Sequence, residues 1–599
     1  MSSKPNIKGG GVATFEVKVD GTAVPGDIDF FSIDVDKQIN RISRSILVIK
    51  DGKAATAKFD ISSSKTFVPG AAVTISAGYD SKNEVIFEGI ITGQSIKINH
   101  EYGSALEVEC SDKAIKMTVG RKSKTFSKKK DSEIINTIIN AAGGLTSDVT
   151  STDTQWEEQV QYYSTDWDFV LSRAEANGLI VTTENGKVSV IKPDANTKSV
   201  LTTEFGDNIL EFDCELNSVE QLGKVQASTW DYKTQKLING SATSSLSGAG
   251  NLSTKKLADV LGISEYDLQT SGTLQEADLT SWSKAELVKS QYSKIQGEVK
   301  ILGSSLPAPS KYITLSGVGD RFNGDVLVSG VRHHISEGMW ETAISVGLSA
   351  SWFTENQDVM SPPASGLLPG TRGLYNATVK KIYEDPDNQY RILINIPLFD
   401  TEGEGLWARL SNFYSTSGAG AFFLPEVGDE VVIGFLNDDP RFPIILGSLY
   451  SSSEIKPFDG LNPAEKNPKK AIVSKSKMYV EFDDENIVLT SMTPEKNQLV
   501  LSDKDKKIIV KDQSGNSLTM SESGIEMKSE KDITIQAAQK LTLKGDMGIT
   551  LESSTGDIEE KGMNIKGTAQ MQYSAQGSVS AQVQGGAELT LKGAMVMIN

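Results

Sequence analysis

The C-terminal part of the sequence, residues 518–599, repeats one short pattern of apolar and polar positions. Apolar residues come in pairs two positions apart, and most pairs start seven or eight residues after the previous pair. The pairs are Leu518/Met520, Ile525/Met527, Ile533/Ile535, Leu541/Leu543, Ile549/Leu551, Met563/Ile565, Met571/Tyr573, Val579/Ala581, Leu589/Leu591 and Met595/Met597. Because residues two apart point to the same face of a strand, the pattern predicts short strands with one apolar face, joined by polar, Gly-rich turns.

A repeat this short cannot bury its own apolar face, so something must cover it. One solution is a single-chain solenoid in which three repeats make one coil. The other is a prism in which three chains each supply one wall. Both leave little exposed sheet edge, and the periodicity alone does not choose between them. The regular apolar pairs argue against a disordered tail.

The first half of the chain alternates short apolar runs with turns, which is typical of a barrel or sandwich. The predicted strands cover residues 12–19, 27–33, 45–49, 71–78, 85–98 and 106–110, and again 297–302, 312–315, 326–333 and 342–348. After a Pro- and Ser-rich linker at 361–366, five further strands fall within residues 375–450. Five strands in so short a block predict a small OB-type barrel.

Two helices are predicted between the strand blocks. Asp131 is a candidate N-cap for a helix that buries Ile134, Ile135, Ile138 and Ile139 and stops at Gly143-Gly144. The second helix starts after a strand, with Ser164 or Asp166 as its cap, and ends near Gly178. A hairpin about Asn185-Gly186 follows, because this dipeptide favours a tight turn.

Residues 235–280 are rich in Ser, Gly and Thr and are interpreted as an inserted, peripheral segment with a helical patch at 254–261. A longer helix is predicted over 277–293. No function is assigned to the insertion.

The 599-residue chain carries a net charge of −18, which disfavours a general nucleic-acid or anionic-membrane binder. The lysines between Lys113 and Lys130 are interpreted as a solvated face, or as a contact with an acidic subunit, because no aromatic residues interleave for stacking. The N-terminus has no apolar core of a signal peptide, and no apolar run reaches 18 residues. We therefore expect synthesis in the cytoplasm, without a membrane anchor.

The sequence offers little for catalysis or metal binding. Cys110 and Cys214 lie in strand-like runs and are interpreted as two small buried residues rather than a disulfide or a metal site. The adjacent His333 and His334 point to opposite faces of one strand. Asp166 and Asp168 stand at a helix start, where carboxylates favour the helix dipole, so capping is preferred over acid–base chemistry. No metal and no cofactor are expected.

Residues 423–450, FLPEVGDEVVIGFLNDDPRFPIILGSLY, resemble the OB-domain signature of the VgrG family of spike proteins, which fuse a phage tail hub to a needle. The strands RILINIP and LWARL upstream fit the same domain. The run VQYYSTDWDFVLSRAEANG at 160–178 is similar to the hub of this family, and the C-terminal repeat is similar to its needle.

The resemblance implies a mainly β fold. It has two hub β-barrel domains with helices, an OB-fold barrel, and an intertwined triple-stranded β-helix, or β-prism, formed by a homotrimer. The expected boundaries are a first hub barrel at 1–110, a helical/β hub segment at 111–234, an insertion at 235–294, second-barrel strands at 295–360, a linker at 361–374, the OB domain at 375–450, a linker at 451–474 and the needle at 475–599.

The resemblance also implies a function and a set of contacts. The expected role is that of the structural spike of a contractile injection apparatus, either a type VI secretion system or an extracellular phage-tail-like system, and not an enzyme. The trimer core is assigned to Ile533, Ile535, Leu541, Leu543, Ile549, Leu551, Met563 and Ile565. A PAAR-type tip protein is expected to dock on Met595, Val596, Met597, Ile598 and Asn599.

Further expected partners are a hexameric inner tube, baseplate proteins, effector cargo and, transiently, a target membrane, but no nucleic acid. The protein would be secreted or injected by the apparatus after cytoplasmic assembly. One alternative is a cell-wall glycan hydrolase of a phage-like needle, although residues 451–472 are too short for an inserted catalytic domain. Another is a nucleic-acid-binding OB protein, which the acidic residues of the barrel oppose.

Overall fold

The structure is a computed structural model of the chain, and it describes residues 11–100, 103–244, 248–263, 265–356, 359–401, 403–451, 456–458, 461 and 463–598. It divides into two compact units, Met1–Leu449 and Tyr450–Asn599, each of which is treated by itself below. Within the described residues, no helix is both long enough and apolar enough to cross a membrane.

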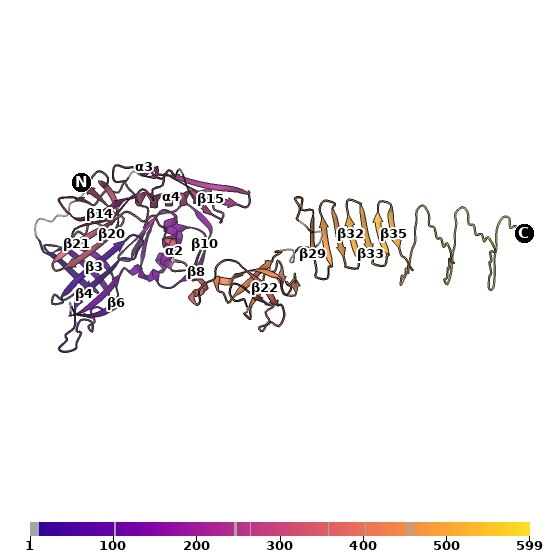
Figure 1. The fold of residues 1–599 in the computed structure, drawn as a ribbon, viewed down its shortest axis with the longest axis horizontal. Helices are drawn as coiled ribbons and strands as arrows, with labels where there is room; N and C mark the ends of the chain where they lie inside the picture. The colour runs from indigo at the N-terminus through magenta and orange to yellow at the C-terminus, as the bar shows by residue number, and fades with distance from the viewer. Residues whose placement is uncertain are drawn as a thin grey trace. The chain divides into compact units, whose positions relative to one another are not determined.

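Thirteen strands of the first unit pair into one sheet (Figure 1). They are β1 (Ala13–Val19), β2 (Thr22–Ala23), β3 (Phe30–Gln38), β4 (Arg44–Lys50), β5 (Ala72–Tyr79), β6 (Lys82–Asn99), β7 (Gly103–Ser111), β13 (Leu201–Glu204), β14 (Ile209–Leu216), β18 (Ile295–Leu302), β19 (Tyr312–Ser316), β20 (Gly324–Ser336) and β21 (Met339–Val346). The early and late strand blocks join where β3 pairs with β20, with Val35 opposite His333. Both blocks therefore share one sheet, and their division into two hub barrels stays a prediction.

The sheet folds around apolar side chains that alternate along its strands, as the sequence pattern predicts. Ile33, Leu47, Val73 and Phe87 are buried in the early block, and Val299, Ile313 and Ile344 are buried in a second cluster of the late block. The predicted strand positions are confirmed in both blocks to within a few residues.

The segment predicted as the helical part of the hub, called the hub segment, lies between the strand blocks in sequence. Its elements are η1 (Lys113–Thr118), β8 (Lys122–Lys130), α1 (Asp131–Ala141), β9 (Thr146–Val149), β10 (Gln155–Ser164), α2 (Asp166–Ala176), β11 (Ile180–Glu184) and β12 (Lys187–Ile191). The predicted isoleucine stripe of α1 is buried, and the hairpin of β11 and β12 turns at Asn185 and Gly186, both with positive φ.

Both predicted helix caps are wrong by one residue. Helix α1 begins at Asp131 with Lys130 as its N-cap, and the Asp131 side chain instead accepts bonds from another helix. The N-cap of α2 is Thr165, whose hydroxyl accepts a hydrogen bond from the Asp168 amide at 3.0 Å. The local backbone geometry decides which residue is the N-cap, and residue type alone does not fix that geometry.

The predicted insertion is not a loose appendage. Strand β15 (Lys224–Asp231) is flanked by β16 (Lys236–Thr243) and β17 (Tyr266–Thr270) in a three-stranded sheet, and α4 (Glu276–Tyr292) packs on it; α3 (Thr254–Ala258) lies between β16 and β17. A Cβ on Gly240 would lie within 2.6 Å of Leu279, so only glycine permits this approach of β16 to α4. The segment is therefore structurally integrated into the first unit.

The OB-type barrel is confirmed. Strands β22 (Tyr375–Lys381), β23 (Ile392–Asn395), β24 (Leu406–Leu410), β27 (Glu430–Phe435) and β28 (Pro443–Ser448) close into a barrel around Ile394, Val431, Ile433 and Ile445. A short hairpin of β25 (Ser415–Thr416) and β26 (Ala419–Gly420) and the turns η2 (Phe353–Glu355), η4 (Pro363–Gly366) and η5 (Leu436–Asp438) complete this unit.

The second unit begins with a seven-stranded antiparallel meander in which each strand pairs with the next (Figure 1). Its strands are β29 (Lys469–Val473), β30 (Tyr479–Asp483), β31 (Val488–Met492), β32 (Gln498–Ser502), β33 (Lys507–Lys511), β34 (Ser517–Ser521) and β35 (Gly524–Lys528). Strand β29 lies inside the segment predicted as a linker. Residues 469–528 form their strand pairs within one chain, so this part of the predicted needle at 475–599 has a sheet of its own in the single chain.

Candidate functional site: the uncovered apolar surface of the C-terminal unit

One face of the meander carries two rows of apolar side chains that run across the strands. The strand register places Phe482, Leu489, Leu501, Ile508, Met520 and Ile525 in the first row. It places Ile472, Val480, Ser491, Leu499, Val510, Leu518 and Met527 in the second. Paired residues of an antiparallel sheet point to the same side, so these rows form one surface. Ser491 interrupts it, and Lys470 of β29, opposite Phe482, ends the first row.

Much of this surface is left open by the described residues. Leu501 in the middle of the sheet is 37% exposed, and Ile525 on the last strand is 71% exposed. A soluble protein rarely leaves a continuous apolar patch of this extent open, and such patches mark contact sites. The two rows are therefore the first part of the candidate site.

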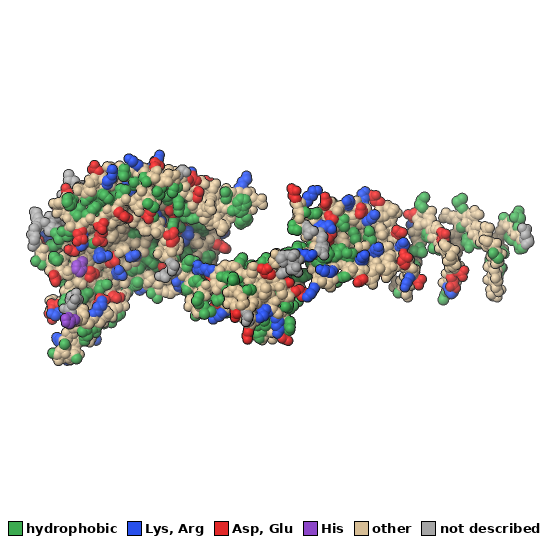
Figure 2. Space-filling view, in the orientation of Figure 1, with side chains coloured by type: hydrophobic (Ala, Val, Ile, Leu, Met, Phe, Trp, Pro, Cys, Tyr) green, Lys and Arg blue, Asp and Glu red, His purple; other side chains and the backbone are tan. Residues whose placement is uncertain are grey.

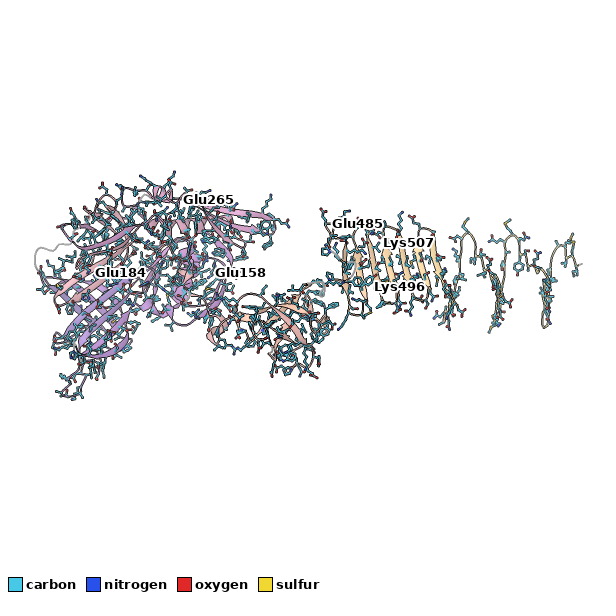
Figure 3. The ribbon with its side chains drawn as sticks, viewed as in Figure 1. Glu158, Glu184, Glu265, Glu485, Lys496 and Lys507 are labelled. Carbon is cyan, nitrogen blue, oxygen red and sulfur yellow. The ribbon has the colours of Figure 1, made fainter. Side chains whose placement is uncertain are left out.

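The opposite face of the same sheet is mixed in character. Its central row runs through Glu481, Thr490, Val500, Ile509, Thr519 and Glu526. Lys469 donates to Glu481 on this face at 3.1 Å. Glu485 and Lys496 lie in the turns at opposite ends of β31 (Figure 3). The strong apolar character is thus confined to one side, as expected of a wall that faces an interior.

The tail continues this surface without a sheet of its own. The described residues 529–598 contain no strand or helix, and none of their backbone amides donates to a backbone carbonyl. Apolar side chains recur along the tail in the space-filling view (Figure 2). Backbone donors and acceptors are obligatory hydrogen-bonding groups, so a tail in this state is suited to pairing with other chains.

The predicted trimer-core residues all lie in this tail with their side chains uncovered. The exposed fraction of these side chains runs from 51% at Ile533 to 99% at Met563. The eight residues are Ile533, Ile535, Leu541, Leu543, Ile549, Leu551, Met563 and Ile565. The predicted tip residues Met595, Val596, Met597 and Ile598 are also exposed, and Asn599 lies outside the described residues. The structure brings none of them together within one chain.

Of the two aspartates considered for catalysis, Asp166 has its carboxylate engaged in structural bonds, and Asp168 takes part in the N-cap of α2 through its backbone amide. Asp166 accepts bonds from Lys122 at 2.5 Å and from Gln161 at 3.1 Å, and the amide of Asp168 is bound by the Thr165 cap. Among the described residues, no group of three or more His, Cys, Asp or Glu is placed to hold a metal ion. Both cysteines are free thiols. Cys110 is buried, as predicted, whereas Cys214 is only partly buried because its strand β14 stands at the end of the strand order. Burial raises the pKa of each thiol to about 12.

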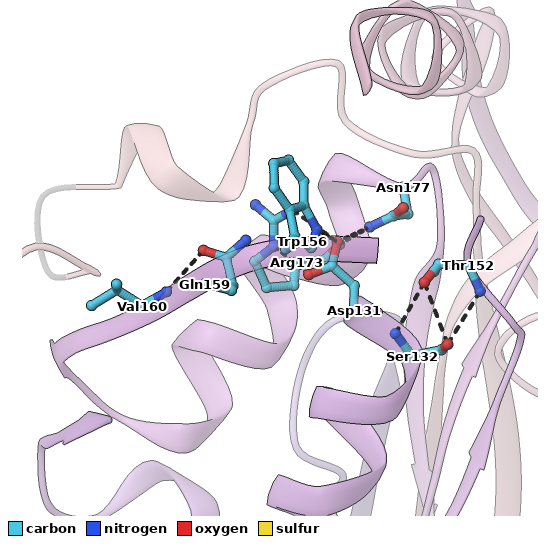
Figure 4. A network of polar contacts seen from close by, with 8 residues as sticks. All are labelled: Asp131, Ser132, Thr152, Trp156, Gln159, Val160, Arg173 and Asn177. Atoms are coloured by element: carbon cyan, nitrogen blue, oxygen red, sulfur yellow. Dashed lines mark hydrogen bonds and ion pairs between the residues drawn. The ribbon is translucent and has the colours of Figure 1, made fainter. Parts of the chain in front are cut away.

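A buried charged network joins α1 and α2 (Figure 4). Asp131 accepts from Arg173 Nε at 2.9 Å and NH2 at 2.8 Å, from Asn177 Nδ2 at 3.0 Å and from Trp156 Nε1 at 3.1 Å. Burial alone would raise the pKa of Asp131, but the bonds and charge of Arg173, with Asn177 and Trp156, hold that pKa below its ordinary value. The network orders α1 against α2 and leaves no free base for chemistry.

Sequence reasoning missed the upstream part of the apolar surface, although its signal was present. Val480/Phe482, Leu499/Leu501 and Ile508/Val510 are the same kind of pair, two residues apart, as those of the tail. Their spacing is irregular because hairpin turns of different length separate them, so they do not stand out as a repeat.

Comparison with known families gives two matches. Residues 9–337 match the family of the Alg8 N-terminal domain, and residues 375–450 match the type VI secretion system/phage-baseplate injector OB domain. The second match coincides with the closed barrel of β22 to β28 and with the boundaries predicted for it.

Two relatives are type VI secretion system spike proteins of Pseudomonas aeruginosa. The chain is 23% identical to VgrG1b over 359 residues, which cover 55% of this chain and 47% of the relative. It is 24% identical to VgrG1a over 225 residues, which cover 35% and 34%. The chain therefore spans less than half the length of these relatives.

Solved structures give partial likenesses. A 43 kDa tail protein of prophage MuSo2 from Shewanella oneidensis covers 56% of this chain, with 99% of its own length matched, at 12% identity and a TM-score of 0.44. One chain of a Francisella PdpA-VgrG complex covers 88% of this chain, with 89% of its own length matched, at 10% identity and a TM-score of 0.36.

The Alg8-type match extends over more than half of the chain, and the OB match covers the baseplate domain. The chain belongs to the family of the Alg8 N-terminal domain and carries a type VI secretion system/phage-baseplate injector OB domain. Its sequence is similar to those of VgrG spike proteins. It is mainly β in fold.

Proposed function

We propose that three copies of this chain assemble into the central spike of a contractile injection apparatus, with the C-terminal unit as the needle. The observation that carries the proposal is the apolar surface that begins on the meander and continues, pair by pair, along the tail. A chain that leaves this surface open in isolation needs other chains to cover it.

Burial of these side chains is a sufficient driving force for association. Each large apolar side chain contributes about 1.5 kcal/mol or more when it is removed from water. The eight predicted core residues, Ile533 to Ile565, are each at least half exposed in the single chain. Three tails that turn these residues toward a shared axis would bury them and would also satisfy the backbone groups of the tail by inter-chain strand pairing.

The two parts of the needle would then differ in construction. In residues 469–528 each chain already forms its own sheet, so three preformed walls would pack through their apolar faces. In residues 529–598 the strands would form only on assembly, as an intertwined β-prism. The proposed domains are otherwise those expected from the sequence, with the hub barrels forming a ring that fits a hexameric tube.

The role of such a spike is mechanical. Sheath contraction would drive a stiff trimer against a target membrane, and the force would concentrate at the narrow end. Ladder bonds between chains resist unravelling because many of them must fail together. We assign baseplate and inner-tube proteins to the hub as partners, and effector cargo and a PAAR-type protein to the tip. The chain would assemble in the cytoplasm and leave it with the apparatus.

A charge placed inside the prism tests this arrangement. Ile533→Asp would bury three carboxylates around one axis, so it should abolish the trimer. Thr534→Asp is the matched control, because neighbouring residues of a strand face opposite ways and Thr534 would face outward. Sedimentation of both variants measures the effect. Trimers of Ile533→Asp would contradict the assignment of the core, and loss of the trimer in both variants would contradict the proposed facing.

The tip is tested separately. Deletion of residues 594–599 should leave the trimer intact and abolish binding of the PAAR-type protein, measured by co-purification. Retention of binding by the shortened chain would place the dock elsewhere.

A further inference from the structure

A cavity of about 770 Å³ opens in the hub where elements from distant parts of the sequence meet. Its walls come from α2, from β10, from the start of α4 and from residues 350–355, and β17 of the integrated insertion supplies a further side. The sequence assigned no role to the insertion, and neither the spike proposal nor the needle uses this cavity.

The walls of the cavity are rich in aromatic side chains. Trp156, Tyr266, Trp282 and Trp352 all line it. Aromatic faces attract cations, and they also cover the apolar stem of a long basic side chain. The cavity therefore offers the surroundings in which proteins bind arginine or lysine.

Two buried carboxylates lie among these rings. Asp278 is 8% exposed, and its Oδ2 accepts from the Gln275 amide at 3.1 Å. Its Oδ1 is buried and has no hydrogen-bond partner among the described residues. Glu286, also 8% exposed, accepts from Trp352 Nε1 at 2.6 Å, and burial raises the pKa of its carboxyl group. A buried carboxylate oxygen without a donor is costly, so a donor that reaches it would be bound favourably.

Acidic residues outnumber basic ones in the described lining of the cavity. Glu220 and Glu355 line it as well, whereas the basic residue in its described lining is Arg173. The guanidinium of Arg173 donates hydrogen bonds to both carboxylate oxygens of Asp131, and its Cζ lies 5.3 Å from the centroid of the Trp156 ring. Lys289 lies just outside this lining, over the Trp352 ring at 5.3 Å, and is paired with Glu175. The site is thus acidic and aromatic, and its one arginine is committed to another partner.

We propose that this cavity binds a basic side chain, arginine or lysine, presented by a partner protein of the hub. The aromatic walls would hold the stem and the face of the cationic group. Asp278 and Glu286 would accept its N–H donors. The inference does not rest on the needle, because every residue that carries it lies in the first unit.

The test uses the full chain and two small probes of nearly the same shape. N-acetyl-arginine amide carries the charge, and N-acetyl-citrulline amide replaces the guanidinium by a neutral urea. Titration followed by tryptophan fluorescence should show saturable binding of the arginine probe and much weaker binding of the citrulline probe. Because binding is measured on the hub, the result is separate from whether the chain is a trimer.

Two variants assign the binding to the cavity. Asp278→Asn removes a charge but keeps an oxygen that accepts from the Gln275 amide. Glu286→Gln likewise removes a charge but keeps an oxygen that accepts from Trp352 Nε1. Each should weaken binding of the arginine probe by about tenfold, the effect of removing a close opposite charge. Glu276→Gln makes the same change at an exposed position in the first turn of the same helix, outside the cavity, and should bind as the unmodified chain does.

Several results would overturn the proposal. They are equal binding of the two probes, no saturable binding of the arginine probe, or equal weakening by the Glu276→Gln control. A change of oligomeric mass in Asp278→Asn or Glu286→Gln would identify the occupant as a second copy of the chain. It would therefore overturn the proposal that a separate partner protein supplies the basic side chain. Circular dichroism checks folding, and if one cavity variant does not fold, the other carries the test.

Discussion

Arg173 and Asp131 join the two hub helices through a bidentate ion pair, with Nε to Oδ1 at 2.9 Å and NH2 to Oδ2 at 2.8 Å (Figure 4). The Asp131 side chain is 2% exposed and that of Arg173 is 20% exposed. Removal of one partner from such a pair leaves an uncompensated charge in a place that water does not reach freely. The relationship therefore makes a prediction about the stability of the hub.

Asp131→Ala should lower the free energy of unfolding of the hub by about 3 kcal/mol, because Arg173, Asn177 and Trp156 all lose their acceptor. Urea titration followed by circular dichroism measures the change. Asp153→Ala removes a carboxylate at an exposed position of the same segment and should change the value by no more than about 0.5 kcal/mol. Equal effects of the two substitutions would show that the network does not stabilise the hub.

His333 predicts a pH dependence of stability. It is fully buried in β20, where Trp340 Nε1 donates to its Nδ1, and burial lowers its pKa from 6.5 to about 3. The unfolded chain binds this proton below pH 6.5 while the folded chain does not, so the contribution is full above pH 6.5 and is lost as pH falls toward 3.

His333→Gln removes this titration, so the thermal midpoint of the variant should fall less steeply between pH 6.5 and 4 than that of the unmodified chain. His100→Gln changes an exposed histidine in the turn after β6 and should leave the slope as it is. Parallel curves for the unmodified chain and His333→Gln would contradict the placement of a neutral, buried ring.

The two faces of the meander should respond differently to a charge. Leu501→Asp falls on the apolar face, and Thr519→Asp falls in the central row of the opposite face. If three walls pack through the apolar face, Leu501→Asp should weaken the trimer strongly, and Thr519→Asp should not. Size-exclusion chromatography with light scattering compares them, and a trimer that tolerates Leu501→Asp but not Thr519→Asp would reverse the inward and outward faces.

Much of this architecture could be predicted from alternation and turn chemistry. The five OB strands, the isoleucine stripe of α1 and the Asn185-Gly186 hairpin are local patterns, and each is confirmed. The helix caps were missed because Lys130 and Thr165 take positions that their neighbours Asp131 and Ser164 could equally occupy by residue type.

The candidate surface was predicted only in part, and for a physical reason. The apolar pairs of the tail repeat at a nearly constant interval. In the meander, hairpin turns of different length separate the strands, so the two apolar rows become visible only once the strand register is known. The hub cavity could not be predicted, because Trp156, Asp278, Glu286 and Trp352 are brought together by the packing of β10, α4 and residues 350–355. The join of the two strand blocks through β3 and β20 likewise depends on pairing over a distance of almost 300 residues in sequence.

The mass of the full chain in solution tests the central claim most directly. One chain has a mass of 64.6 kDa. Analytical ultracentrifugation across a range of concentrations should find a single species of three times that mass, because three apolar walls and three tails cover one another. A folded species of one chain mass, stable at the same concentrations, would contradict the account.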